Sequence, residues 1–295
     1  MKVFVTGAKG QLGSDVVKEL LSRGYNTVGV DVDELNITDE YAVRKRIAIE
    51  KPDTVIHCAA WTDVDAAQDC ENISTVRAVN VNGTENIARA CGEIACKIVY
   101  ISTDYVFDGT GTTPWTEDCK TGLPLSVYGQ SKLDGERVTA QNTDRFFIVR
   151  TSWAFGKNGK NFVDAMLMLG KQKKTVNVVA DQIGTPTYTR DLAKLLADLI
   201  ATEKYGYYHA TNEGGFISWY DFATEIFRLA SKYDGEYASV KAVPITTQEY
   251  GAKAERPLNS RLDTSKLKKA GFELLPDWRD ALERYLKEVF RGKSE

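Results

Sequence analysis

The sequence predicts an α/β fold class: a doubly wound parallel sheet with a smaller C-terminal α/β lobe. Short apolar runs alternate with segments whose apolar residues recur at helical spacing, which is typical of parallel strands covered by helices. A glycine-rich turn directly follows the first apolar run. The 295 residues, 43% of them hydrophobic, can bury one large core or two modest ones.

The first element is a buried strand over residues 3–5, and it runs straight into the turn that contains Gly7, Gly10 and Gly13. Leucine and valine then recur with helical period over residues 12–21. Glycines at such a strand-to-helix junction let the backbone turn tightly and approach a pyrophosphate, which free amide groups at the helix N-terminus can bind. We therefore expect a Rossmann-type dinucleotide site at this turn.

A second strand is expected over residues 27–31, and it ends in the carboxylate of Asp31. An acid at this distance from the glycine turn hydrogen-bonds the adenosine ribose hydroxyls of NAD, and it would repel a 2′-phosphate. The sequence therefore favours NADH and leaves NADPH open; the alternative reading of Asp31 is an ordinary acid that faces water. Asn36 and Ile37 precede a helix over residues 41–50, and we expect them to line the adenine pocket.

Two further strands bring small and hydroxyl side chains to the carboxyl edge of the sheet, where ligands of this fold class lie. The third, over residues 54–60, ends in Ala59 and Ala60, which we expect to pass beneath the cofactor. The fourth, over residues 97–104, delivers Thr103 to the same edge.

Tyr128 and Lys132 lie four residues apart in a segment that reads as helix, so they share one face. A nearby cation lowers the pKa of a phenol by about 1 to 3 units, which suits it for proton transfer. The same spacing occurs at Tyr41 and at Tyr237. Only Tyr128 follows a strand that ends in Thr103 and precedes another strand, so we expect this pair at the nicotinamide.

Charge and cysteine content exclude several classes of function. A net charge of −3 and a pI near 5.7 give no electrostatic basis for binding nucleic acid or an anionic membrane. The five cysteines form no Cys-x-x-Cys pair, and there are two histidines, so we expect no metal site, no disulfide framework and reduced thiols. No apolar run approaches membrane-spanning length. We expect a cytoplasmic protein that binds small molecules, with a homodimer left open.

The remaining elements fit two lobes between which the chain crosses more than once. We expect an NAD(P)-binding domain over residues 1–154 and about 188–210, and a smaller substrate-binding lobe over about 155–187 and 211–295. Two more strands are expected, over residues 146–150 and 175–180. Five more helices are expected, over residues 76–94, 161–171, 189–202, 219–230 and 278–289. The first of these helices contains Asn80.

Several motifs identify a family. They are Thr-Gly-Ala-x-Gly-Gln-Leu-Gly at residues 6–13, Ser-Thr-Asp-Tyr-Val-Phe-Asp-Gly at 102–109, Tyr-Gly-x-x-Lys at 128–132, Arg-Thr-Ser-Trp at 150–153, Asn-Phe at 161–162, Asp-Gln-x-Gly-Thr-Pro-Thr at 181–187 and Arg-Pro-Leu-Asn-Ser-x-Leu at 256–262. Together they resemble the dTDP-4-dehydrorhamnose reductases, which are extended short-chain dehydrogenase/reductases, over nearly the whole chain. The resemblance adds Gln11 and Leu12 to the expected cofactor-binding residues.

The resemblance implies NAD(P)H-dependent reduction of the C4 keto group of dTDP-4-dehydro-6-deoxy-L-mannose to dTDP-L-rhamnose. In that reaction Tyr128 donates a proton to the developing alkoxide, and Lys132 holds the nicotinamide ribose and lowers the pKa of the phenol. Thr103 hydrogen-bonds the carbonyl; Ser102 is the weaker alternative because successive strand residues face opposite sides of a sheet. The implied substrate-binding residues are Thr103, Asp104, Val106, Tyr128, Trp153, Arg256 and Asn259.

Three of these residues have structural alternatives. Trp153 can cover an apolar face of a deoxysugar or can simply pack in a core. Arg256 and Asn259 suit a nucleotide diphosphate, since a guanidinium fork matches phosphate oxygens, but Arg256 can also be a solvated loop charge.

Two other functions stay open. A nucleotide-sugar epimerase or dehydratase would share the glycine turn and the Tyr–Lys pair but would retain its NAD through each cycle. A non-catalytic relative could keep the fold as a regulatory subunit.

Overall fold

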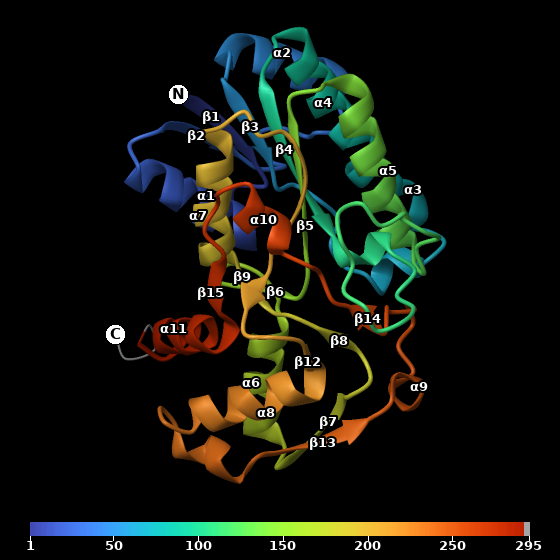
Figure 1. Cartoon of the computed structure of the whole chain (residues 1–295), viewed down its shortest axis with the longest axis vertical. Coiled ribbons are helices and arrows are strands. Elements are labelled where there is room, and N and C mark those ends of the chain that lie inside the picture. Colours follow the sequence, from blue (N-terminus) through green and yellow to red (C-terminus); the bar gives the residue numbers. More distant parts are fainter. Residues whose placement is uncertain (292–295) are drawn as a thin grey trace.

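The computed structural model describes residues 1–291, which form two lobes arranged along the long axis of the molecule (Figure 1). Its α-helices are α1 Gln11–Ser22, α2 Glu40–Glu50, α3 Ile73–Arg77, α4 Thr84–Glu93, α5 Val127–Asn142, α6 Phe162–Gln172, α7 Thr189–Ile200, α8 Trp219–Ala230, α9 Thr247–Tyr250, α10 Ser265–Lys269 and α11 Trp278–Arg291. Its strands are β1 Lys2–Thr6, β2 Asn26–Val30, β3 Thr54–His57, β4 Lys97–Thr103, β5 Phe146–Thr151, β6 Ala154–Phe155, β7 Thr175–Val179, β8 Ile183–Gly184, β9 Thr187–Tyr188, β10 Gly206–His209, β11 Asn212–Glu213, β12 Ile217–Ser218, β13 Lys241–Ile245, β14 Asn259–Ser260 and β15 Leu275–Asp277.

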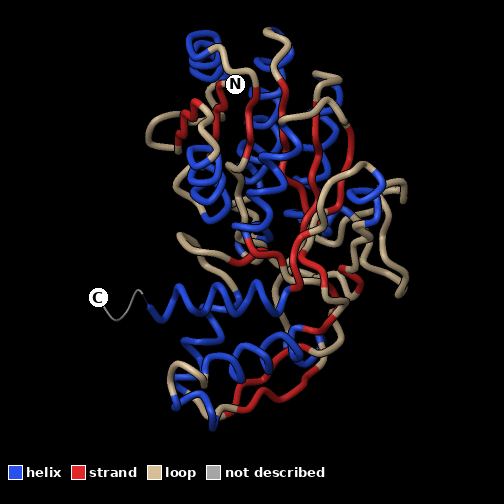
Figure 2. The backbone as a smooth tube through the Cα atoms, turned by 60° about the vertical axis from the view of Figure 1, so that its left-hand side comes forward, coloured by secondary structure: helices blue, strands red, loops and turns tan. Residues whose placement is uncertain are grey.

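A six-stranded parallel sheet organises the larger lobe, in the order β10-β5-β4-β3-β1-β2. Helices lie on both sides of this sheet (Figure 2). The doubly wound fold class is therefore confirmed. The strand order reverses between β1 and β3, and in such sheets a ligand binds at the carboxyl ends of the strands beside that reversal.

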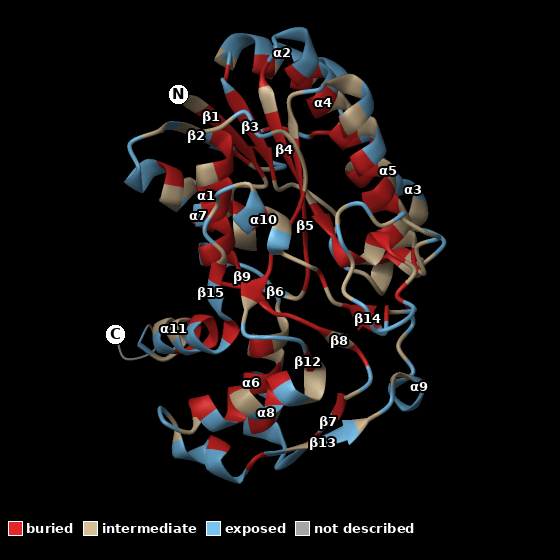
Figure 3. Cartoon of the chain, in the orientation of Figure 1, coloured by how far each residue is buried: buried red, intermediate tan, exposed pale blue. Residues whose placement is uncertain are grey.

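Alternating side chains of the strands build the two cores of the larger lobe. On β1, Val3 and Val5 pack with Leu20 of α1 and Leu196 of α7, whereas Phe4 faces the opposite side. That opposite core contains residues of α2 and α4, such as Ile47 and Ile87. Buried residues follow the strands of the sheet, while the outer surface of α2 is exposed (Figure 3).

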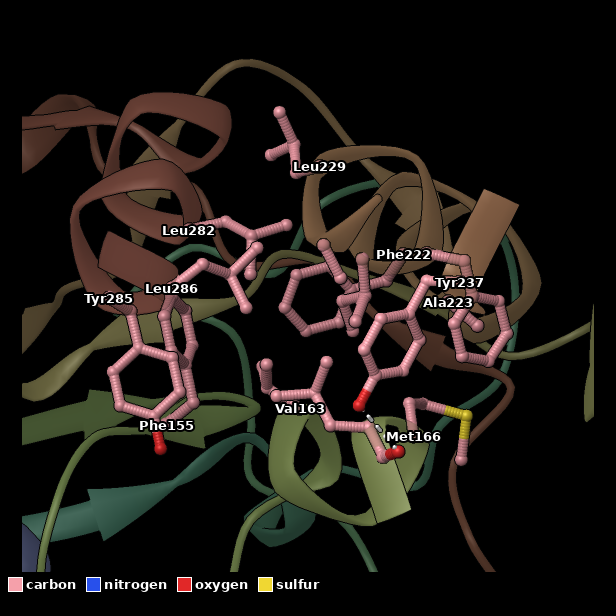
Figure 4. Packing of buried hydrophobic residues seen from close by; sticks show 14 of the residues in the cluster. Phe155, Val163, Met166, Phe222, Ala223, Leu229, Tyr237, Leu282, Tyr285 and Leu286 are labelled. Atoms are coloured by element: carbon pink, nitrogen blue, oxygen red, sulfur yellow. Dashed lines mark hydrogen bonds between the residues drawn. The ribbon is translucent and has the colours of Figure 1, made fainter. Parts of the chain in front are cut away.

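The smaller lobe has an aromatic-rich core of its own. Phe155 stacks on Tyr188 with ring centres 5.3 Å apart, and residues of α6, α8 and α11 close around them. Figure 4 shows Val163, Phe222 and Tyr285 converging on this core.

The chain crosses between the lobes repeatedly. After α6 and β7 it returns through α7, which packs on α1, and through β10, which pairs with β5 at the edge of the sheet. It then enters the smaller lobe at α8, and α10 lies back against β10. The exact division at about residues 155, 188 and 211 stays a prediction.

The elements that were expected from the sequence form, with two local differences. The single helix expected over residues 76–94 is three helical pieces: α3, the π-helix η2 Ala78–Gly83, and α4. The third strand ends at His57 rather than at Ala60. Apolar periodicity does not distinguish a π-helical turn from an α-helical one.

Candidate active site

Helix α5 presents the Tyr–Lys pair at the carboxyl edge of the sheet. The helix starts at Val127 because the Ser126 hydroxyl caps it by accepting from the Gly129 amide at 3.1 Å. Tyr128 and Lys132 are then one turn apart, and Lys132 is only 4% exposed. Tyr41 and Tyr237 lie elsewhere, Tyr41 on the exposed surface of α2 and Tyr237 in the core of the smaller lobe.

Thr103 lies where β4 ends, beside Tyr128. Its hydroxyl donates to the Asp104 carboxylate at 3.0 Å and accepts from the Tyr105 amide at 3.3 Å. A hydrogen bond between Thr103 and Tyr128 acts to lower the pKa of the phenol. The structure therefore brings together the three residues to which the sequence assigned the chemistry: Thr103, Tyr128 and Lys132.

The charge states of this pair differ from the expectation. Burial raises the pKa of Tyr128 above its ordinary value, and the negative charge of Asp104 adds to the effect. The direction is the opposite of the one that the Tyr–Lys spacing predicts, and burial is its main cause. The Lys132 ammonium lies 4.1 Å from the centre of the Tyr100 ring. Burial lowers the pKa of Lys132 to about 7, and the Glu136 carboxylate opposes that shift.

The glycine turn forms a tight cradle between β1 and α1. Gly7 has φ +65°, and a Cβ on it would lie 2.7 Å from the Ala59 amide nitrogen. A Cβ on Gly13 would lie 2.0 Å from the Gly7 carbonyl oxygen. Only glycine fits at these two positions, and α1 begins at Gln11 with its first amides directed out of the helix. Ala59 therefore lies beside the turn. Contact of Ala60 or Leu12 with the cofactor stays a prediction.

The Asp31 carboxylate lies at the rim of this cradle. It accepts from the Lys9 amide at 2.9 Å and from the Val32 amide at 2.8 Å. The Lys9 ammonium binds Asp33 at 2.6 Å, so a lysine of the turn offsets part of the negative charge that follows β2. The sequence interpretation did not take Lys9 into account.

The two residues expected at the adenine have structural contacts of their own. The Asn36 side chain accepts from the Thr38 amide and hydroxyl, at 3.1 and 2.9 Å. Ile37 is 7% exposed and its side chain lies against Gly83. Contact of either residue with adenine stays a prediction.

The π-helix places Asn80 behind the catalytic helix. The Asn80 side chain accepts from the Trp61 amide at 2.8 Å and donates to the Ser131 hydroxyl at 2.9 Å. Ser131 in turn donates to the Tyr128 carbonyl at 2.7 Å. Asn80 therefore supports the backbone of α5 at Tyr128.

Trp153 is at the boundary between the lobes in an uncommon backbone conformation. Its φ is +51°, and its indole stacks on Trp219 with ring centres 3.7 Å apart. A Cβ on Gly184 would lie 3.0 Å from the Trp153 ring, so the ring packs closely on β8. Packing is thus an observed role of Trp153, and contact with a sugar stays a prediction. The sequence interpretation missed Trp219.

The other residues expected at the substrate are held by neighbours. Arg256 binds Asp65 in a bidentate pair, with distances of 3.1 and 2.6 Å. The Asn259 amide donates to the Thr110 and Thr113 carbonyls at 3.1 and 2.9 Å. These contacts fasten the segment 253–260 to the larger lobe, and diphosphate binding by either residue stays a prediction.

Asp104 and Val106 follow Thr103 in the short 3-10 helix η3, Asp104–Val106. Burial raises the pKa of Asp104 to about 6, although hydrogen bonds from Ser260 and Thr103 oppose the shift. Val106 is fully buried in a small cluster with Phe107. Val106 follows Thr103 by three residues, and its contact with a substrate stays a prediction.

Residues 1–291 contain neither a metal-binding cluster of this kind nor a membrane-spanning helix. No group of three or more His, Cys, Asp or Glu side chains in this part of the chain is arranged to hold a metal ion. None of the described helices is long and apolar enough to cross a membrane.

The fold and this site define a short-chain dehydrogenase/reductase of the extended type. Residues 1–291 match the family model described as the RmlD substrate binding domain, and the chain belongs to this family.

Curated relatives and solved structures agree with this membership. The dTDP-4-dehydrorhamnose reductase of Aggregatibacter actinomycetemcomitans is 42% identical, over 95% of this chain and 97% of that protein. The dTDP-4-dehydrorhamnose reductase of Streptomyces griseus is 43% identical, over 95% and 91%. A crystal structure of the dTDP-4-dehydrorhamnose reductase of Bacillus anthracis in complex with NADP is 40% identical and has a TM-score of 0.90, covering 97% of this chain and 99% of that one.

Proposed function

We propose that this chain reduces the C4 keto group of dTDP-4-dehydro-6-deoxy-L-mannose to give dTDP-L-rhamnose, with a reduced nicotinamide dinucleotide as hydride donor. The observation that carries the proposal is the meeting of Thr103, Tyr128 and Lys132 at the carboxyl edge of a dinucleotide-binding sheet. Relatives at 42% and 43% identity over nearly full length bear the name of this reductase.

The residues present fit a dinucleotide. A side chain at Gly13 would fill the space between the turn and α1, so glycine keeps the backbone open to a pyrophosphate. Gly7, Gly10, Gln11, Leu12 and Gly13 would hold the pyrophosphate, Asp31 the adenosine ribose, Asn36 and Ile37 the adenine, and Ala59 and Ala60 the nicotinamide half. When bound, the reduced nicotinamide supplies the hydride.

In the proposed mechanism, Tyr128 is the general acid. Its raised pKa keeps the phenol protonated near neutral pH, which is the form needed to donate a proton to the oxygen at C4. Thr103 would orient the same oxygen, and the Lys132 ammonium would bind the nicotinamide ribose. Proton donation by a positioned acid contributes about 10² to 10⁴ in rate.

For the substrate, we propose Asp104 and the backbone at Val106 beside the sugar, Trp153 on its apolar face, and Arg256 with Asn259 on the diphosphate. The geometry of Arg256 supports the proposed diphosphate contact. Its planar guanidinium binds the Asp65 carboxylate in a bidentate manner, which is also how a guanidinium binds phosphate.

The cofactor preference is proposed to be NADH, with NADPH also accepted. Asp31 disfavours a 2′-phosphate, whereas the nearby Lys9 ammonium would attract one. The Bacillus anthracis relative was crystallised with NADP. Comparing kcat/KM for NADH and NADPH in wild type and in Lys9→Ala tests this: the variant should lose activity with NADPH and keep it with NADH.

The assay for the proposed function is consumption of added cofactor. We expect purified protein to oxidise one equivalent of NADH or NADPH for each dTDP-4-keto-sugar consumed. Protein that carries tightly bound NAD and converts the sugar without consuming added cofactor would be an epimerase or dehydratase instead. Protein that binds both ligands without turnover would be a regulatory relative.

A further inference from the structure

A buried ion pair lies one helical turn from Lys132, on the face of α5 that carries Tyr128 and Lys132. It joins Glu136, on the same helix, to Arg150 on β5. The Arg150 guanidinium donates from Nε to Glu136 Oε1 and from Nη2 to Glu136 Oε2, both at 2.8 Å. The two side chains are 2% and 3% exposed. A pair this deeply buried has lost its hydration, so it is stable only with good geometry and further hydrogen bonds.

A third donor completes the coordination of the Glu136 carboxylate. The Ser102 hydroxyl donates to Glu136 Oε1 at 2.5 Å. Ser102 immediately precedes Thr103 on β4, so this hydrogen bond ties the helix that carries Tyr128 to the strand that carries Thr103. It also explains why Ser102 is not available to a substrate: its hydroxyl is directed at Glu136.

Arg150 is enclosed on its other sides. Its guanidinium carbon lies 5.1 Å from the centre of the Phe107 ring and 5.0 Å from the centre of the Tyr207 ring. Its Nη1 lies 3.4 Å from His209 Nε2, while His209 Nδ1 lies 3.0 Å from the Trp115 carbonyl oxygen. We assign the ring proton to Nδ1, which donates to the carbonyl, so that Nε2 accepts from Arg150. The neutral histidine therefore completes the enclosure without adding charge.

The charges that act on Lys132 come from few groups. Glu136 lies one turn further along α5, on the same buried face. His57 and Cys58 come from the end of β3, and Tyr100 comes from β4. Burial lowers the pKa of His57 to about 3 and raises the pKa of Cys58 to about 12, and it also raises the pKa of Tyr100. Among these described neighbours of Lys132, Glu136 supplies the one carboxylate.

We propose that Glu136 is a positioning residue of the active site: its carboxylate, fixed by Arg150 and Ser102, favours the ammonium form of the buried Lys132 side chain. The inference rests on the proposed function, because that function needs Lys132 as a cation beside the nicotinamide ribose. Burial disfavours the ammonium, and the Glu136 charge offsets this effect from a fixed position. Arg150 fixes the position of this carboxylate through two charge-assisted hydrogen bonds.

The test is a direct titration of Lys132 by NMR, with lysine labelled with carbon-13 at Cε. The signal of Lys132 is assigned by its loss in Lys132→Met. Three variants are compared with wild type: Glu136→Gln, which removes the charge; Glu136→Asp, which keeps it on a shorter side chain; and Asp191→Asn as the matched control. Asp191 is an equally buried carboxylate that is bound by an arginine, Arg284, on another helix.

We expect the pKa of Lys132 to fall by about one unit or more in Glu136→Gln, and to stay at the wild-type value in Asp191→Asn. Glu136→Asp should retain most of the wild-type value even where its melting temperature drops. A Lys132 titration that is unchanged in Glu136→Gln would overturn the proposal. If Glu136→Gln does not fold, the double variant Glu136→Gln/Arg150→Gln decides: a lowered pKa supports the proposal, and an unchanged or raised pKa overturns it.

This titration does not use the sugar substrate. A protein that fails to reduce the keto sugar but shows the expected shift would contradict the proposed function and leave the Glu136 effect in place. A protein that reduces the keto sugar but shows no shift of the Lys132 pKa in Glu136→Gln would support the reductase assignment and overturn the role of Glu136.

Discussion

The Lys132 ammonium lies 4.1 Å from the centre of the Tyr100 ring. Tyr100 is fully buried on β4, and its hydroxyl donates to the Lys132 carbonyl at 3.2 Å, so one aromatic residue contacts both ends of the lysine. The negative face of the ring partly compensates the ammonium for its lost hydration. The lysine ammonium therefore packs on the ring of Tyr100, rather than on the phenol that the sequence pairs with it.

Removing the Tyr100 ring should make Lys132 a weaker base. We expect Tyr100→Leu to lower the pKa of Lys132 by about one unit, because a desolvated cation–π contact is worth about 1 to 2 kcal/mol. Tyr100→Phe is the matched control, since it keeps the ring. The lysine titration described above measures both variants, and an equal shift in Tyr100→Phe would assign the effect to the hydroxyl instead.

Substitutions at the glycines of the turn should differ sharply in their effects on stability and on NADH affinity. In Gly13→Ala the new Cβ would lie 2.0 Å from the Gly7 carbonyl oxygen, so the turn must distort. In Gly10→Ala the nearest atom would lie 3.2 Å away, which a small shift can relieve. We expect Gly13→Ala to lose about 1 to 3 kcal/mol of stability and most of its NADH affinity, and Gly10→Ala to lose much less. Calorimetric titration with NADH and thermal unfolding check this order; equal affinities would contradict it.

Arg256 should contribute to nucleotide-sugar affinity. Loss of a charge-assisted contact with phosphate costs about 1.5 to 3 kcal/mol, so Arg256→Ala should bind dTDP about 10- to 100-fold more weakly. Asp65→Asn is the control, because it disrupts the Arg256–Asp65 pair and keeps the guanidinium. If Arg256→Ala binds dTDP as wild type does, the pair with Asp65 serves only to join the lobes.

The two histidines should make the fold acid-sensitive. Burial lowers the pKa of both His57 and His209 to about 3, so both stay neutral in the folded chain. In the unfolded chain they take up protons below about pH 6.5, so the unfolded state binds more protons and stability falls as pH falls from 6.5 towards 3. Each histidine should lower the free energy of unfolding by about 2 kcal/mol when the pH falls to 5. The raised pKa of Asp104 acts in the opposite sense below pH 6 and reduces the total.

Urea unfolding at pH 7.5 and pH 5 measures this effect. His209→Gln should remove about 2 kcal/mol of this loss, since glutamine cannot gain the proton. A variant that loses stability with pH as steeply as wild type would show that His209 does not stay neutral in the fold.

The sequence determined most of the framework of this site. The order of glycine turn, Asp31, Thr103 and Tyr128 is enough to predict a parallel sheet and the edge at which these residues meet, because a doubly wound sheet gathers the ends of its strands. It could not show the charge states. Nothing in the spacing of Tyr128 and Lys132 indicates that the ammonium turns to Tyr100, since that contact depends on how closely α5 packs on β4.

That close packing depends on one residue. A Cβ on Gly135 would lie 2.1 Å from the Tyr100 hydroxyl oxygen, so glycine is needed for α5 to approach the strand. The sequence could not predict the partners of Arg256 and Trp153 either. These partners, Asp65 and Trp219, are distant in the chain, and neither belongs to a motif. Glu136 does carry a signal, since it follows Lys132 by one helical turn.

The central claim is that Tyr128 protonates the C4 oxygen while hydride reaches C4. The most direct measurement uses NADH deuterated at C4 of the nicotinamide, with the dTDP-4-keto sugar as substrate, and locates the label in the product by NMR. The account predicts one deuterium at C4 of the sugar for each NADH oxidised by wild type. It predicts a rate lower by about 10² to 10⁴ in a Tyr128→Phe variant that still folds and binds NADH. Full turnover by Tyr128→Phe, or label absent from C4, would contradict it.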